Sequence, residues 1–136
     1  MKPLIVTIGW ADKVNANGRV YPRHELERAL LKIAQDSITR GRVFGQVGMP
    51  DGTGGAELDK IAFIVGNLEI TDDGELKGEV VWLKTEAGDR AKAVHTADPS
   101  IWFFRPAGVG KLRTIDDVVQ IFDYRILSIN MVLNGA

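Results

Sequence analysis

Cysteine is absent from this sequence, and histidine occurs only at His24 and His95. Without thiols the chain can form no disulfide bond, no thiol nucleophile and no cysteine-based zinc site. Two imidazoles are also too few for a histidine-rich metal centre. We therefore expect neither a metal nor a cofactor.

An excess of charge of one sign is missing as well. The 136 residues include 17 Lys and Arg and 18 Asp and Glu, which gives a formal net charge of −1. Nucleic-acid-binding domains usually carry a basic excess on one face, so this balance argues against a nucleic-acid partner. No apolar run approaches the ~20 residues of a membrane span, and the first residues lack the pattern of a signal peptide. We expect no membrane association.

What is present is an ordinary globular composition, with 45% hydrophobic and 26% charged residues, in a length that fits one domain over residues 1–136. Apolar and β-branched runs predict strands at 2–10, 42–47, 58–70, 76–83, 101–104, 118–124 and 125–133. Helical spacing predicts a long helix over 22–40, and Thr85 is a typical N-cap for a short helix ending near Thr96. The fold class expected is α+β, a mainly antiparallel sheet or small barrel of six to eight strands with one long and one short helix.

Two glycine-rich segments, 48–55 and 108–112, could be mistaken for phosphate-binding loops. Neither has the Gly-Lys-Ser/Thr ending, because Leu112 stands where the second would need a hydroxyl. We expect both to be flexible connectors. The paired acids are expected to be solvated turn residues, since neighbours on a strand point to opposite faces. These pairs are Asp72/Asp73 and Asp116/Asp117.

Six segments, in this order, resemble motifs of the prohead (procapsid maturation) proteases of tailed bacteriophages, which share a fold with the herpesvirus assemblins. The most specific is 15–22 (NANGRVYP), similar to a stretch that precedes a long helix in that family. The others are 44–51 (FGQVGMPD), 58–64 (LDKIAFI), 78–88 (GEVVWLKTEAG), 101–106 (IWFFRP) and 124–132 (YRILSINMV). The resemblance covers about residues 4–133 and implies a prohead-protease-like fold.

The resemblance also implies where catalytic groups would stand, and three of them are replaced. Met49 falls at the catalytic histidine, Phe103 or Phe104 at the nucleophilic serine, and Asn130 at the acidic position of the last strand, while Arg105 is retained. Thioether, phenyl and carboxamide groups cannot serve as base, nucleophile or imidazole-orienting acid. The resemblance thus predicts a catalytically degenerate member, a pseudoprotease that is not an enzyme.

A relocated catalytic set is the alternative. His95 and Ser100 lie five residues apart with Asp98 between them, although working triads are assembled from separate elements. The competing interpretation makes His95 a surface helix residue and Ser100 a turn residue beside Pro99. His24 is expected to be solvated in the first turn of the long helix.

The aromatic segment has two interpretations. On a strand, Trp102 and Phe104 share one face and Phe103 takes the other, so the segment either fills the old cleft as core or presents an anchor to a partner. Met49 and Pro50 would extend the same apolar patch. The partner-binding candidates are Trp102, Phe104, Met49 and Pro50.

From the resemblance and the replaced groups we expect a bacteriophage virion structural protein. The main hypothesis is a capsid decoration (cement) protein, a homo-oligomer that binds the major capsid protein and stabilises the head. It would reside in the virion capsid, assembled in the host cytoplasm. The alternatives are an active procapsid maturation serine protease with a relocated catalytic set, and an internal core or scaffold partner.

Overall fold

The computed structural model describes residues 3–52 and 54–133, so Lys2, at the start of the first expected strand, lies outside it. The described part contains seven strands and two α-helices, which confirms the expected α+β class. The elements are β1 (Leu4–Trp10), β2 (Arg19–Val20), α1 (Arg23–Ala34), β3 (Val43–Gly45), a 3₁₀ turn (Leu58–Lys60), β4 (Phe63–Ile70), β5 (Glu75–Trp82), α2 (Glu86–Ala97), a second 3₁₀ turn (Pro99–Ile101), β6 (Trp102–Ile115) and β7 (Val118–Leu133).

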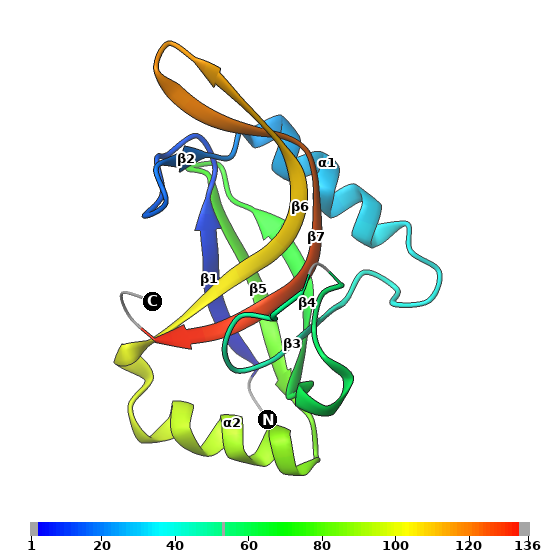
Figure 1. Cartoon of the computed structure of the whole chain (residues 1–136). Coiled ribbons are helices and arrows are strands. Elements are labelled where there is room, and N and C mark those ends of the chain that lie inside the picture. The colour runs from blue at the N-terminus through cyan, green and yellow to red at the C-terminus, as the bar shows by residue number, and fades with distance from the viewer. Residues whose placement is uncertain (1–2, 53, 134–136) are drawn as a thin grey trace.

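The strands form two sheets that face each other across the core (Figure 1). One is antiparallel with the order β1-β5-β4-β3, and the other has the order β2-β7-β6, with the short β2 parallel to β7. The segment after β3 joins the two sheets. Gly48 donates its N–H to the carbonyl of Met131 at 2.8 Å, and Met131 donates to Gln46 at 2.9 Å. Strand β7 therefore contacts both halves of the molecule.

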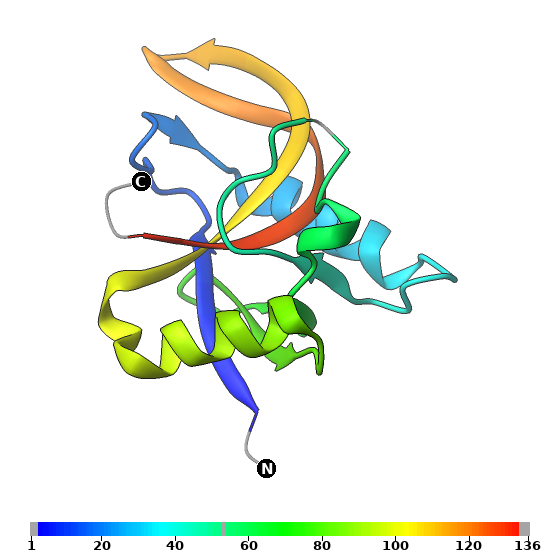
Figure 2. The ribbon, with the colours of Figure 1, turned by 60° about the horizontal axis from the view of Figure 1, so that its bottom comes forward.

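The core lies between the sheets and is sealed by the two helices. Phe63, Val65, Ile129 and Met131 have no exposed surface. Helix α1 buries Leu26, Ala29 and Ile33 at helical spacing and packs on β7. Helix α2 lies across the end of the antiparallel sheet, as Figure 2 shows, and its N-cap Thr85 accepts a hydrogen bond from the N–H of Gly88, as expected.

Strands β6 and β7 extend beyond the body as a two-stranded arm, defined here as residues 108–123 (Figures 1 and 2). The arm turns at Asp116 and Asp117, both with positive φ (52° and 65°), as a two-residue hairpin loop requires. Both acids are exposed, as expected of turn residues. The side chains of Val109, Leu112 and Ile115 are more than a third exposed.

Two boundaries differ from the expectation. The long helix ends at Ala34 rather than near residue 40, because the carboxylate of Asp36 accepts the N–H groups of Ile38 at 2.8 Å and Thr39 at 3.1 Å. That local turn offers the backbone an alternative to the helix. The strand expected over 58–70 begins only at Phe63, after the first 3₁₀ turn.

The segment 108–112 is not a connector but part of β6. A Cβ on Gly108 would lie 2.3 Å from the carbonyl oxygen of Arg125, and one on Gly110 would lie 2.9 Å from the Ile121 side chain. Glycine stands here because the paired strand approaches closely. The two strands expected at 118–124 and 125–133 are likewise one strand, with Asp123 at a positive φ of 51°.

Candidate functional site

The fold brings together two of the positions that the family resemblance marks as catalytic. The Nδ2 of Asn130 on β7 lies 3.8 Å from the Sδ of Met49, which follows the β3 segment, although 81 residues separate them. The same Nδ2 donates to the Oγ of Ser128 at 3.1 Å, and both Ser128 and Asn130 are fully buried. None of these groups is a base. The Ser128 hydroxyl, with no exposed surface, is closed to a substrate.

The aromatic segment divides between core and surface. Phe104 is 4% exposed, and its ring centroid lies 5.5 Å from that of Phe63. The expectation that Phe104 is a surface anchor for a partner is therefore wrong, because the residue belongs to the core. Trp102 is half-buried and donates its Nε1–H to the carbonyl of Val94 on α2 at 3.1 Å. The neighbouring Phe103 is 37% exposed. Met49 and Pro50 reach the surface, and their partner-binding role stays a prediction together with that of Trp102.

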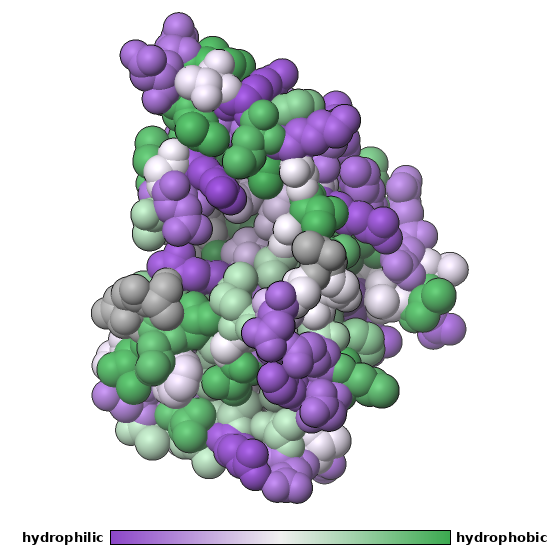
Figure 3. Space-filling view, viewed as in Figure 1, coloured by the Kyte–Doolittle hydropathy of each residue, from purple (hydrophilic) through white to green (hydrophobic). Residues whose placement is uncertain are grey.

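A cavity of about 270 Å³ lies beside Met49, lined chiefly by the end of β1, the segment 15–21 and the first half of β6. Arg105 reaches its wall, and its buried Nε has no hydrogen-bond partner among the described residues. The Oδ1 of Asn130 is also buried without a partner there. Figure 3 shows the molecule hollowed between β2 and the start of β6.

A second depression, the β1–β6 groove, runs between two strand edges. Strand β1 ends the antiparallel sheet and β6 ends the other, so within the described part of the chain neither pairs with a strand on this side. The groove has a volume of about 480 Å³ and is walled by Leu4–Trp10 of β1, the start of β6, His95 and Pro99. Its β1 wall was not foreseen from the sequence, because only the sheet order shows that this edge is open.

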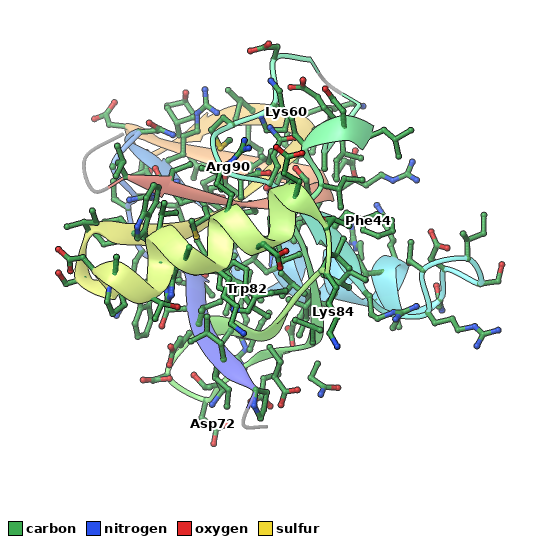
Figure 4. The ribbon with its side chains drawn as sticks, turned by 90° about the horizontal axis from the view of Figure 1, so that it is seen from below. Phe44, Lys60, Asp72, Trp82, Lys84 and Arg90 are labelled. Carbon is green, nitrogen blue, oxygen red and sulfur yellow. The ribbon has the colours of Figure 1, made fainter. Side chains whose placement is uncertain are left out.

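His95 is buried rather than exposed, which corrects the expectation of a surface helix residue. Its imidazole lies between the rings of Trp82 at 5.6 Å and Phe104 at 5.8 Å. Figure 4 shows Trp82 beneath α2. Burial disfavours the imidazolium and lowers the pKa of His95, so the ring is neutral at pH 7. His24 is exposed, as expected.

Ser100 lies in the turn that follows α2, beside the groove wall formed by Pro99. Its Oγ donates to the Oδ1 of Asp98 at 2.6 Å, and its N–H donates to the same oxygen at 3.2 Å. The Asp98 carboxylate therefore accepts the hydrogen bond of the Ser100 hydroxyl and is also the N-cap of the 3₁₀ turn. No hydrogen bond joins His95 to Ser100 in the described residues, so the three groups are near in sequence but not assembled as a triad.

Two further properties bear on the kind of site. Within residues 3–52 and 54–133, no group of three or more histidine, aspartate and glutamate side chains could hold a metal ion. Neither described helix is long and apolar enough to cross a membrane.

The chain was compared with known families, curated proteins and solved structures. No family model and no curated protein matches it. Among solved structures it is similar to the bacteriophage T4 capsid assembly protease gp21, with a TM-score of 0.78 and 18% sequence identity, over 96% of this chain and 81% of that one. The fold is prohead-protease-like. At this identity the match establishes the fold alone.

This match contradicts the expectation that the protein is not an enzyme, because the solved structure that shares its fold is a protease. That expectation rested on three replaced side chains. Their replacement removes one set of catalytic groups, and it does not show that the rest of the chain is inactive.

Proposed function

We propose that the chain is a head-assembly peptidase of a tailed phage, a procapsid maturation protein that acts on capsid proteins. The observation that carries the proposal is the β1–β6 groove, with a neutral imidazole in its wall and a hydroxyl–carboxylate pair in the adjoining turn. The likeness to a capsid assembly protease supports the substrate class.

The groove would bind its substrate as an added strand. Both of its long walls are edge strands of their sheets, and an extended peptide can pair with the backbone of such an edge while its alternate side chains enter pockets. The exposed ring of Phe103 lies in the groove wall as an apolar contact for the substrate.

Cleavage would begin at Ser100. Its Oγ attacks the scissile carbonyl carbon, and its proton passes to the neutral imidazole of His95, which then gives it to the leaving amine. Water then attacks the carbonyl of the resulting ester and gives a proton to His95, and His95 returns a proton to the Oγ of Ser100 as the ester bond breaks. In the free protein Asp98 holds the hydroxyl hydrogen, so binding must first bring Ser100 into reach of His95.

The test is incubation of the purified chain with the scaffold and capsid precursors of its own phage, followed by mass spectrometry of the products. We expect specific cleavage that the Ser100→Ala variant loses by a factor of at least about 10³, as removal of a nucleophile does. Ser37→Ala, at an exposed serine outside the groove, is the matched control. Unchanged cleavage by Ser100→Ala, or no cleavage by the unaltered chain, would overturn the proposal.

A structural role in the head is the second candidate, favoured by the exposed apolar side chains of Phe103 in the groove wall and of Met49 beside the other cavity. As a decoration protein, the chain would bind the major capsid protein as a homo-oligomer. Its copy number in mature particles separates the roles. Stoichiometric retention on the outside supports decoration, whereas loss during maturation supports an internal core or scaffold partner.

A further inference from the structure

A basic pocket lies on a different side of the fold from both the Met49 cavity and the β1–β6 groove. It is formed by the last turns of α1, the segment that follows, β3 and β7, and it shares no lining residue with either of them. Its volume is about 370 Å³. Figure 4 shows Phe44, one of its residues, beside α1. We call it the Arg42–Arg125 pocket.

Four charged side chains line this pocket, namely Lys32, Asp36, Arg42 and Arg125. None of the three cations has a carboxylate oxygen within 4.0 Å among the described residues. The Asp36 carboxylate is already used by the N–H groups of Ile38 and Thr39. These bonds, with a smaller contribution from the nearby Arg125 charge, lower the pKa of Asp36, so it stays ionised. The pocket therefore carries a net charge of about +2 at neutral pH.

One of the three cationic side chains, that of Arg42, is held in place before any ligand arrives. The Nε of Arg42 donates to the carbonyl of Thr39 at 3.0 Å, which fixes the guanidinium and leaves its two terminal nitrogens free to bind. Arg125 stands on β7 and Lys32 on the last turn of α1, so the three cations come from three separate elements. Buried Ala29, Ile33 and Val43 form the apolar walls of the pocket, and the three cationic residues at its edge are exposed to solvent.

We propose that this pocket binds a dianionic phosphate group, either inorganic phosphate or a phosphate monoester. A monoester carries about −1.5 to −2 at pH 7, which matches the pocket, whereas a carboxylate or a phosphodiester carries only about −1. Guanidinium groups present paired N–H donors that fit phosphate oxygens. The site is independent of peptide cleavage, since no residue of the groove takes part.

The test is a titration of the ¹⁵N-labelled full chain with inorganic phosphate at pH 7.5 and constant ionic strength, followed by amide chemical shifts. Saturable shifts are expected at residues 29–44 and 125–127. Methyl phosphate separates the two sources, because equal binding shows that the pocket accepts a monoester, and binding of phosphate alone assigns it to the free ion. Dimethyl phosphate, a diester, is expected to bind at least ten times more weakly.

Substitutions at the pocket complete the test. Arg42→Gln and Arg125→Gln are each expected to weaken phosphate binding at least tenfold. Arg113→Gln makes the same charge change on the exposed arm, where the guanidinium lies 5.0 Å from the Phe122 ring, and should leave affinity unchanged. The spectra of the variants report whether the fold is retained. The proposal fails if shifts do not saturate, if dimethyl phosphate binds equally well, or if all three variants behave alike.

Discussion

At the scale of the single residue, His95 shows how distant parts of the chain set the chemistry of one group. The sequence places it on a short polar helix, a pattern that predicts an exposed side chain. Its burial comes from Trp82 on β5 and Phe104 on β6, and no local pattern contains that information. The contact between Met49 and Asn130 is different, because the family resemblance predicts both positions and the fold brings them together.

The burial of His95 predicts how stability depends on pH. Its pKa is lowered in the folded state, so the unfolded chain binds the proton more tightly. This stabilisation is complete above the ordinary pKa of about 6.5 and is lost as the pH falls toward the folded value, with a slope of at most about 1.4 kcal/mol per pH unit. Urea unfolding between pH 7.5 and 5 should show the wild type losing stability relative to His95→Phe.

The exposed His24 supplies the control for this prediction. His24→Gln removes the other imidazole of the sequence at an exposed position of α1, so it is the matched variant for the same series of unfolding measurements. An equal difference between wild type and His95→Phe at both ends of the pH range would contradict the assignment.

At the scale of the element, the glycines of β6 explain why the arm was not foreseen. Glycines spaced by one residue resemble a loop, and only the positions of Tyr124 and Ile121 on the paired strand show that a side chain would not fit. Local side-chain chemistry, by contrast, accounts for the turn at residues 15–18. Asn15 Oδ1 accepts from the N–H groups of Asn17 and Arg19, and Gly18 has a positive φ of 74°.

The base of the arm is fixed to α1 by Glu25, which is 3% exposed. Its Oε1 accepts the N–H of Asp123 at 3.3 Å, where β7 has its positive φ, and Arg28 lies within 4 Å of both carboxylates. Glu25→Leu removes this acceptor from a part-buried N–H, which should lower the free energy of unfolding by about 1–3 kcal/mol. Amide hydrogen exchange over residues 108–123 should also become faster.

Glu25→Gln is the matched variant, because the amide keeps an oxygen that can accept from Asp123. It should preserve the slow exchange of the arm while weakening the ion pair with Arg28. If Gln and Leu accelerate exchange equally, the hydrogen bond to Asp123 does not hold the arm.

At the scale of the whole molecule, β7 ties the two sheets into one unit. It pairs with β6 and β2, and the backbone of its Met131 forms hydrogen bonds with the segment after β3. Ile129 on this strand has no exposed surface, and its carbonyl oxygen would lie 2.1 Å from a Cβ on Gly45 of β3. The sheets are packed too closely at this point to separate independently.

Ile129→Ala should therefore destabilise both sheets together, by about 2–5 kcal/mol. Trp82 reports on the antiparallel sheet and Trp102 on the other. The measurement uses two variants, one that keeps Trp82 as its only tryptophan and one that keeps Trp102. Their urea-unfolding midpoints should coincide, both without and with the Ile129→Ala substitution. Ile115→Ala at the arm tip is the control and should change stability by no more than about 0.5 kcal/mol. Separate midpoints would show that the sheets unfold as two units.

The projecting arm offers a way to test the proposed location of the protein in a phage head. Because the chain contains no cysteine, a Thr114→Cys substitution would provide its single thiol, at an exposed position next to the hairpin turn. A maleimide dye or gold cluster attached there would mark one end of the molecule, and its radial position in an electron micrograph would show whether that end points toward the DNA or toward the medium.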